Sequence, residues 1–301
     1  MKRTLLFCLA AFLGLSAFAQ SAKQDNTLLW RISGNGLKQP SYLFGTIHLL
    51  CSDDVQLSDS LKAAIKGSDR VYLELDMDNL IELISVVNKM KMNGDTTLAD
   101  LLTDEEYKKV KAFFSNQRSL IPFSMLETYK PRLAASTLMQ SAIECENAIA
   151  MEQLIMQEAK RENKRIKGLE TMAFQISIFD SIPYQVQAKQ LVKYVDDFGK
   201  KDDTSFEELT KAYKDQELSK LEKLTLQEDS GMERFTEIML YNRNEDWVKK
   251  LEKLMTEQAL VVAVGAGHLP GNRGVINLLR KAGYKVEPVK NEMIKKKIKE
   301  I

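Results

Sequence analysis

Two similar tetrapeptides end in the only two histidines of this chain. They are Gly45-Thr46-Ile47-His48 and Gly265-Ala266-Gly267-His268. Imidazole is the commonest metal ligand among side chains, and its ordinary pKa is the nearest to neutrality. The motif glycines Gly45 and Gly265 are expected to let the backbone turn tightly. The pattern therefore predicts a site for metal binding or proton transfer; the alternative is two unrelated polar residues.

A third candidate ligand, Glu74, lies within the predicted strand Arg70 to Leu75. An unpaired carboxylate is costly to bury, so Glu74 must be solvated, paired or bound to a cation. With His48 and His268 it would complete a ligand set of two imidazoles and one carboxylate, which leaves positions open for water or substrate. The alternative is a surface residue on an edge strand. Asp76 points to the same strand face and is a candidate partner of this ligand set.

The segments that position the first histidine and Glu74 indicate alternating strands and helices. Leu28 to Ile32 and Ser41 to Phe44 flank the turn signal Gly34-Asn35-Gly36 and predict a hairpin. Leu57 to Ile65 has helical spacing and precedes the strand of Glu74. His48 is therefore expected on a turn after a strand, where sites in α/β sheets are usually built.

The C-terminal segment repeats this arrangement. A strand over Leu260 to Val264 precedes His268, a helix follows over Val275 to Lys281, and a last strand covers Tyr284 to Val289. The two ends are expected to pair in one sheet. We therefore predict an α/β (α+β) fold, with a mixed sheet built from the N- and C-terminal segments.

Helical patterns dominate the middle of the chain, from about residue 79 to 257. Thr103 to Glu106 forms a capping box, with Leu102 and Tyr107 placed for a hydrophobic staple. Pro131 can open another helix, which would run through Ile143. We expect one domain over residues 20–301 that includes this large helical region.

The first residues have the features of a secretory signal peptide. Lys2 and Arg3 precede an apolar stretch, Leu5 to Leu15, and Ala17-Phe18-Ala19 has the form of a cleavage site. We expect cleavage after Ala19 and a secreted protein, periplasmic or extracellular. No later segment is long and uncharged enough to cross a bilayer, so stable membrane insertion is not expected.

The overall charge argues against a nucleic-acid-binding surface. The formal net charge is +1, and loss of the two basic residues of the leader would make it −1. The Lys-rich end, Lys290 to Lys299, is the exception and is expected to be a solvated helix or a frayed end. The oligomeric state is left open.

Cys51 and Cys145 remain after removal of the leader, which contains Cys8. In an exporting compartment they can form a disulfide, and Cys51 lies three residues after His48. The bridge would brace the loop of the first histidine. Metal ligation by Cys51 is the competing interpretation, but its spacing to His48 matches no recognisable zinc motif.

Several of these segments, taken together, resemble the TraB/PrgY/GumN family, close to its bacterial GumN-like branch. The resemblance extends over nearly all of the chain after the leader. The paired glycine-histidine motifs with the intervening glutamate are its most specific part, and the helical middle is the least specific. The segments are Tyr42 to Leu49, Val71 to Asp76, Lys167 to Thr171 with Gln175, Tyr241 to Asn244 with Trp247, and Val264 to Leu269.

This resemblance implies roles for individual residues. His48, Glu74 and His268 match the residues thought to form the family's metal centre. The related TIKI proteins are metal-dependent proteases that act on peptide ends of Wnt proteins, and they imply Mn²⁺ or Co²⁺, with Zn²⁺ also possible. The family's members differ in their chemistry, so membership does not define a substrate.

Three further residues within the resemblance have open roles. Arg243 could clamp a peptide carboxylate or stabilise an oxyanion, or it could form a salt bridge on a helix surface. Glu170 could be a general base or cap the following helix. Asn244 matches the same motif as Arg243, and its role is less clear.

Two functions remain open from the sequence. The first is an exported metal-dependent hydrolase, a metallopeptidase acting on a peptide or protein substrate with water activated by the ion. The second is a non-catalytic binding protein that uses the same pocket to sequester a peptide or haem.

Overall fold

A computed structural model describes residues 26–53, 55–116, 121–141, 147–198, 205–227 and 235–294. The predicted signal peptide and residues 295–299 of the Lys-rich end lie outside these ranges. Within them, no helix is long and apolar enough to cross a membrane.

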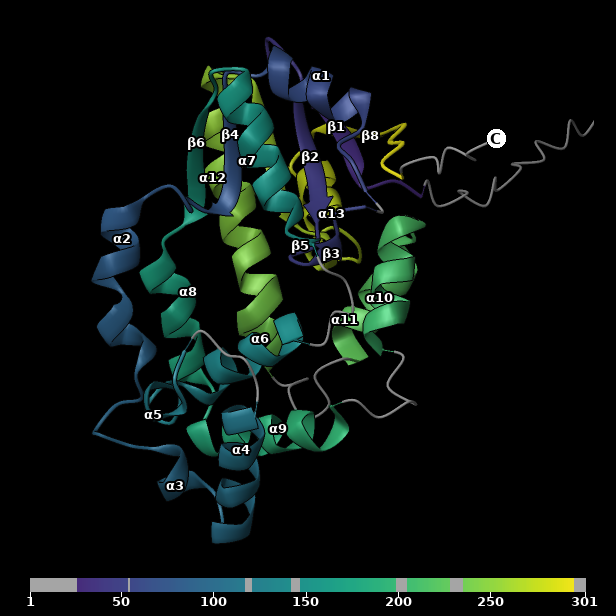
Figure 1. Ribbon diagram of the computed structural model, residues 1–301. Helices are drawn as coiled ribbons and strands as arrows, with labels where there is room; N and C mark the ends of the chain where they lie inside the picture. The colour runs from purple at the N-terminus through teal and green to yellow at the C-terminus, as the bar shows by residue number, and fades with distance from the viewer. Residues whose placement is uncertain are drawn as a thin grey trace, which may run out of the picture.

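The central element is a six-stranded mixed sheet with the order β6-β4-β7-β2-β1-β8 (Figure 1). Strands β2, β7, β4 and β6 run parallel, whereas β1 pairs antiparallel with both β2 and β8. The first and last strands of the chain therefore pair with each other, as predicted. The bounds are β1 Leu29–Ser33, β2 Ser41–Thr46, β4 Arg70–Leu75, β6 Arg165–Glu170, β7 Leu260–Gly265 and β8 Lys285–Val289.

The sheet is covered by helices on both faces. Helices α1 (Asp59–Gly67) and α7 (Met151–Arg161) lie on one face, and α12 (Asn242–Glu257) and α13 (Val275–Lys281) lie on the other (Figure 1). Strand β7 lies inside this sandwich, and each residue of Leu260 to Val264 is buried. This explains why β7 reads as a continuous apolar run.

The middle of the chain is mainly helical, but it also contains β6 and the short strand β5 (Ala148–Ile149), which pairs with β3 (Leu50–Cys51). The prediction named no strand between residues 79 and 257. The helical and turn elements of this region are α2 Leu80–Ser85, η1 Val87–Met90, α3 Leu98–Leu101, α4 Asp104–Asn116, α5 Phe123–Leu126, α6 Pro131–Ser141, α8 Met172–Ile178, η2 Phe179–Ser181, α9 Tyr184–Asp197, α10 Ser205–Lys214, α11 Leu218–Gln227 and the π-helical turn η4 Glu237–Tyr241.

The helical region has an apolar core of its own. Leu98, Val110, Leu126 and Leu191 belong to this core, and they come from helices α3, α4, α5 and α9. The predicted capping box at the start of α4 is present, because the Thr103 amide donates to Glu106 Oε2 (2.9 Å) and the Glu106 amide donates to Thr103 Oγ1 (3.3 Å). Helix α6 begins at Pro131, as predicted.

Candidate functional site

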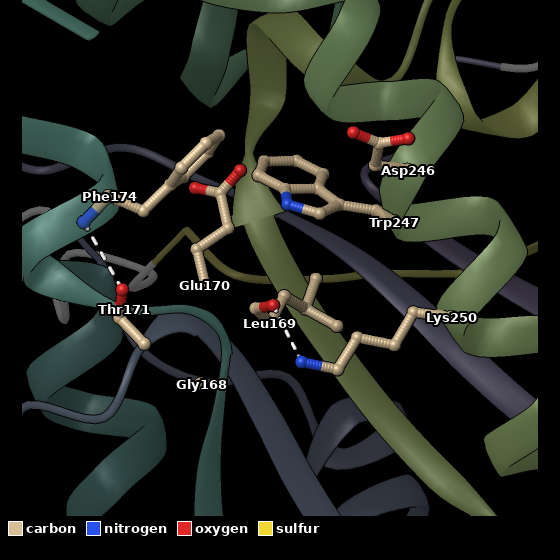
Figure 2. A pocket seen from close by; sticks show the side chains of 8 residues that line it. All are labelled: Gly168, Leu169, Glu170, Thr171, Phe174, Asp246, Trp247 and Lys250. Atoms are coloured by element: carbon tan, nitrogen blue, oxygen red, sulfur yellow. Dashed lines mark hydrogen bonds between the residues drawn. The ribbon is translucent and has the colours of Figure 1, made fainter. Parts of the chain in front are cut away.

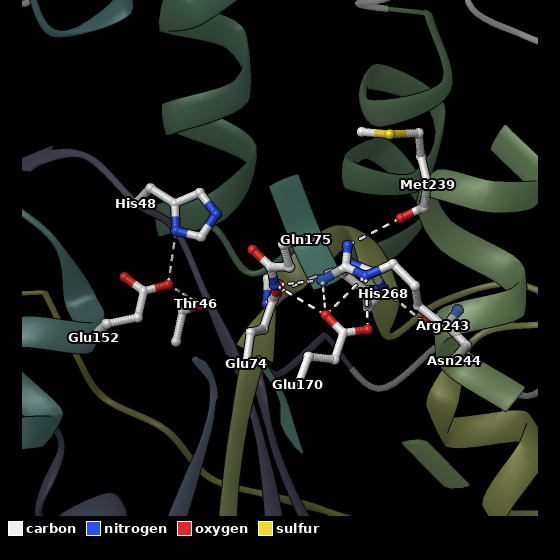
Figure 3. A network of polar contacts seen from close by, with 11 residues as sticks. Thr46, His48, Glu74, Glu152, Glu170, Gln175, Met239, Arg243, Asn244 and His268 are labelled. Atoms are coloured by element: carbon white, nitrogen blue, oxygen red, sulfur yellow. Dashed lines mark hydrogen bonds and ion pairs between the residues drawn. The ribbon is translucent and has the colours of Figure 1, made fainter. Parts of the chain in front are cut away.

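Four parallel strands end on the same side of the sheet, and each leads to a polar side chain of the candidate site (Figure 3). Hydrogen bonds join His48 to Glu152, and a second group of bonds joins Glu74, Glu170 and His268 to Arg243. Glu74 lies near the end of β4, and Glu170 is the last residue of β6. Strand β2 leads to His48, and β7 leads to His268 in the one-turn helix η5 (Ala266–His268). The carboxyl ends of parallel strands are where α/β proteins place their ligands.

Arg243, near the start of α12, connects the two glutamates. Its Nη2 donates to Glu74 Oε2 (2.6 Å) and to Glu170 Oε2 (2.9 Å), and its Nε donates to both oxygens of Glu170 (3.0 and 3.1 Å). Gln175 Nε2 donates to both carboxylates, at 3.1 Å to Glu74 and 3.0 Å to Glu170. Arg243 is only 8% exposed, so it is not an arginine on the helix surface, which was one of the two possibilities that the sequence left open.

All the donor groups of Arg243 have acceptors within the protein. Besides the two carboxylates, Nη1 donates to the carbonyl oxygen of Met239 (3.0 Å) and lies 3.3 Å from Nε2 of His268. Met239 belongs to the π-helical turn before α12, a local irregularity common at functional sites. A substrate clamp by Arg243 therefore requires one of these bonds to be released.

Glu74 remains ionised in this network. Burial by itself raises the pKa of Glu74, but the positive charges of the neighbouring histidines and Arg243, together with the Gly265 amide at 2.8 Å, lower it to about 2. At neutral pH His268 is uncharged, so Arg243 and the protonated His48 are the cations that stabilise this carboxylate.

His268 is held as a neutral imidazole. Burial lowers its pKa to about 3, and the ring packs against Trp247 with the ring centroids 4.5 Å apart. Its Nδ1 lies 2.6 Å from Oδ1 of Asn244, which is fully buried, so Nδ1 carries the proton and donates it to the amide oxygen. Nε2 therefore carries the lone pair of the ring, and this atom lies 3.9 Å from Oε1 of Glu74.

His48 has a similar arrangement with a carboxylate instead of an amide. Its Nδ1 lies 2.9 Å from Oε1 of Glu152, the second residue of α7, and the same oxygen accepts a bond from Thr46 Oγ1 (2.6 Å). The hydrogen bond to Glu152 raises the pKa of His48 to about 9. The side chain is 76% exposed, so solvent weakens the free-energy effect of this pair. In Figure 3 the second ring nitrogen faces the side on which Glu74 and His268 lie.

The residues fit a divalent ion in chemistry and in ring orientation. Each imidazole has its Nδ1 bonded to a protein oxygen, which is the usual way to fix a ligating histidine with Nε2 towards the metal. His268 is neutral at pH 7, whereas His48, with a pKa raised to about 9, must release the proton on Nε2 when it binds an ion. The 3.9 Å between His268 Nε2 and Glu74 Oε1 is within the roughly 4 Å that two ligands on opposite sides of one ion would span. In the described part of the chain, however, no three His, Cys, Asp or Glu side chains form a ready-made metal cluster, and Arg243 contacts both Glu74 and His268.

The motif glycines serve close packing rather than a tight turn. Neither Gly45 nor Gly265 has a positive φ. A Cβ on Gly265 would lie 3.3 Å from Glu74 Oε1, and a Cβ on Gly45 would lie 3.2 Å from Cα of Ala266 in the second motif. The first motif thus packs against the second, and the expected role of these glycines in turning the backbone is corrected.

Two further expectations need correction. Glu170 does not cap α8, because Thr171 is the N-cap residue and accepts the Phe174 amide. Asp76 does not support the ligand set, because its carboxylate lies 3.8 Å from Lys167 Nζ. Glu152 was missed by sequence reasoning, and an acidic residue in the first turn of a helix gave no signal for its role.

The predicted partner of Cys51, Cys145, lies outside the described residues, so their disulfide stays a prediction. Strand β3 pairs Cys51 with Ala148 of β5, and this residue is only three positions from Cys145 in the sequence. The first residue of α7, Met151, donates its amide to the carbonyl oxygen of Ile47 (3.2 Å). The loop of His48 is thereby fastened to the helix that carries Glu152.

The family model for TraB/PrgY/gumN proteins matches residues 28–288, which includes every residue of this network. The chain belongs to the TraB/PrgY/gumN family. Within this family it is distantly related to the TIKI metalloproteases. No solved structure matches the chain.

The curated relatives include TIKI proteins from vertebrates and from a sea anemone. Metalloprotease TIKI2 of Danio rerio is 23% identical over 89% of this chain and 62% of its own length. Metalloprotease TIKI1 of Homo sapiens is 23% identical over 87% and 62%, and the TIKI homolog of Nematostella vectensis is 22% identical over 90% and 68%. The chain thus spans less than two thirds of the length of the first two proteins.

Proposed function

We propose that this protein is an exported metal-dependent hydrolase that cleaves peptide bonds, with His48, Glu74 and His268 as the metal ligands. The matching orientation of the two imidazoles carries the proposal: Glu152 and Asn244 each accept a bond from Nδ1, which leaves Nε2 for a metal. The distant relationship to proteins named metalloproteases supports the same chemistry.

A divalent ion at this position would supply a Lewis acid and an activated water for attack on a carbonyl carbon. The donor set of two imidazoles and a carboxylate suits several divalent ions, and the resemblance to the TIKI proteins favours Mn²⁺, with Co²⁺ or Zn²⁺ as further candidates. The neutral state of His268 and the ionised state of Glu74 are those that metal ligation requires.

Arg243 would then bind the substrate, and this role depends on its contact with His268. Of its bonds, the one to His268 Nε2 is the longest, at 3.3 Å. When His268 gives up this contact, one N–H of Arg243 is free to donate to the substrate carbonyl oxygen as negative charge develops there. Glu170 holds the guanidinium in place, since both of its oxygens bond to Arg243.

The alternative is a binding protein that sequesters a peptide or haem, and one observation favours it. Arg243 already neutralises Glu74 and contacts His268, so these three groups satisfy one another without an ion. Such a protein would bind its ligand stoichiometrically and form no product. An exposed His48 is the side chain that could serve as an axial haem ligand.

Metal analysis and a cleavage assay on the same purified protein test the proposal. We expect Mn²⁺ to bind and a capped peptide library to be hydrolysed, with activity lost on chelation and restored by added Mn²⁺ or Co²⁺. His48→Ala and His268→Ala should each lose most of the metal, and Glu74→Ala should lose activity by orders of magnitude. Equal metal content in the wild type and both histidine variants would refute the ligand set. Binding of peptide or haem without metal-dependent product would favour the alternative.

A further inference from the structure

A cavity of about 340 Å³ adjoins the polar network on the side of the edge strand β6 (Figure 2). Its walls are the strand residues Gly168 to Glu170 with Thr171, the ring of Phe174 from α8, and Trp247 and Lys250 from α12. Glu170 and Trp247 belong to both places, because Glu170 bonds to Arg243 and Trp247 packs against Arg243 and His268. The cavity therefore adjoins the proposed reaction centre through these two side chains.

One wall of the cavity carries a polar group that the protein does not satisfy. The indole Nε1 of Trp247 is buried and, among the described residues, has no hydrogen-bond acceptor. Trp247 itself is 1% exposed, and in Figure 2 this nitrogen lies on the edge of the ring that faces Leu169 and Glu170. Buried N–H groups are nearly always paired, so this donor is available to an acceptor in the cavity, either a water molecule or an oxygen of a ligand.

The strand that lines the cavity has a free edge. Strand β6 is the outermost strand of the sheet and pairs only with β4. The carbonyl oxygen of Leu169 accepts a bond from Lys250 Nζ (2.7 Å). A carbonyl oxygen can accept two bonds, so a peptide N–H can share this acceptor. Exposed strand edges bind extended peptides through such main-chain hydrogen bonds.

The cavity favours an uncharged apolar group over a charged one. Phe174 and Trp247 provide aromatic walls, and Phe174 is 46% exposed with space for a partner. Of the charged groups in its lining, Glu170 pairs with Arg243, Asp246 pairs with Lys249 at 3.0 Å, and Lys250 Nζ donates to the carbonyl oxygen of Leu169 (2.7 Å). A basic ligand side chain would therefore lose its hydration without gaining an unpaired counter-charge, and an acidic one would have to draw Lys250 away from Leu169.

We propose that this cavity is a substrate subsite that takes one apolar residue of an extended peptide, whose backbone runs along the free edge of β6. The apolar side chain packs between Phe174 and Trp247, and a peptide carbonyl oxygen accepts the bond from Trp247 Nε1. This assignment rests on the proposed peptidase function, because it places the peptide next to Glu170 and Arg243.

Intrinsic fluorescence can measure the binding step without catalysis. The chain has two tryptophans. Trp30 lies on β1, which is separated from β6 by the three strands β4, β7 and β2. In the full protein with Trp30→Phe, Trp247 is the only reporter. The probes are capped pentapeptides with alanine on both sides of a central Leu, Phe, Lys or Glu, and they are titrated in the presence of chelator. We expect saturable binding for central Leu and Phe, and binding about tenfold weaker for Lys and Glu.

Two matched comparisons make the test specific. Phe174→Ala should weaken binding of the Leu peptide about tenfold, whereas Met125→Ala, which removes a similarly exposed apolar side chain on α5, should leave it unchanged. N-methylation of the peptide backbone around the central residue should also weaken binding about tenfold, because it removes the N–H that pairs with the strand edge. Equal affinity for all four peptides, or no effect of either change, would overturn the subsite.

This experiment separates failure of the subsite from failure of the proposed function. Specific binding of the Leu peptide without any metal-dependent hydrolysis would retain the subsite and reject the peptidase. Hydrolysis with the same KM in the wild type and Phe174→Ala would retain the peptidase and reject the subsite.

Discussion

The Nη2 nitrogen of Arg243 lies 2.6 Å from Oε2 of Glu74, so a guanidinium lies beside the carboxylate proposed to bind a metal ion. Both side chains are largely buried, with 9% and 16% of their surfaces exposed. A buried carboxylate requires a cation, and Arg243 provides one whether or not an ion is bound. Arg243 therefore stabilises Glu74 when no metal ion is bound, and a bound ion would add a second positive charge beside the same carboxylate.

Replacing Arg243 by Met should destabilise the metal-free protein by about 3–5 kcal/mol, because it leaves Glu74 and Glu170 buried without their cation. Added Mn²⁺ should restore more stability to this variant than to the wild type, since the ion replaces the lost charge. Urea denaturation with and without Mn²⁺ measures both effects. Arg273→Met, which removes a more exposed arginine paired with Glu237 and Glu245, is the control and should cost less. Unchanged stability of Arg243→Met would contradict this account.

The acceptors behind the two imidazoles should control metal affinity. Glu152→Ala and Asn244→Ala should each weaken Mn²⁺ binding about 10–100-fold, because the rings lose the bond that fixes their orientation. Glu152→Gln and Asn244→Asp keep an oxygen acceptor and should recover part of the affinity. Glu158→Gln, a buried glutamate on the same helix as Glu152, should have no effect. Metal titration by calorimetry measures these affinities; equal values for all variants would show that the rings need no support.

The two histidines should titrate at opposite ends of the pH range in the chelated protein. Because they are the only two, their ring proton resonances can be assigned with the single variants. The bond to Glu152 raises the pKa of His48 to about 9, and burial lowers the pKa of His268 to about 3. The contribution of His268 to stability is therefore complete above its unfolded pKa of 6.5 and is lost as the pH falls towards 3.

The sign is reversed for His48. Its contribution is complete below pH 6.5 and is lost as the pH rises through about 9. NMR titration between pH 3 and 10 tests both values. Two ordinary histidine titrations near pH 6.5 would contradict the described hydrogen bonds.

Gly265→Ala should disturb the site more than the fold. The new Cβ would lie 3.3 Å from Glu74 Oε1. The carboxylate must therefore shift, which weakens the hydrogen bond (2.8 Å) that Oε1 accepts from the Gly265 amide. We expect weaker Mn²⁺ binding and a loss of stability of about 1–3 kcal/mol. Gly67→Ala is the matched control, because a Cβ there would meet nothing within 4 Å. If both variants bind Mn²⁺ as the wild type does, the close contact is not required.

Export and the disulfide can be tested on protein isolated from the exporting compartment. Cleavage after Ala19 should be visible by N-terminal sequencing. Non-reducing peptide mapping should recover Cys51 and Cys145 as one linked pair, and removing the bridge should cost roughly 2–5 kcal/mol. Free thiols at both positions would show that the His48 loop keeps its position without a disulfide.

The sequence was sufficient for the two ends of the fold, and it named the principal candidates for the site. Strands β2, β4 and β7 were recognisable because the sheet buries both of their faces, which requires apolar runs. Glu74 was identified because a carboxylate in such a run must have a partner. The motifs ending in His48 and His268 come at the ends of two of these strands. Because β2 and β7 pair in parallel, both histidines lie at the carboxyl end of the sheet.

Only the tertiary structure showed how these residues are connected. Strand β6 escaped prediction because an edge strand is half exposed, and Arg165 to Glu170 has no continuous apolar run. Glu152 and Arg243 lie 104 and 25 residues from the histidines they contact, in helices whose polar positions look like ordinary solvated faces. Their role depends on which helix face packs against the strand ends. Hydrophobic periodicity predicts which face of a helix is buried, but it does not predict which polar residue on the helix contacts a histidine.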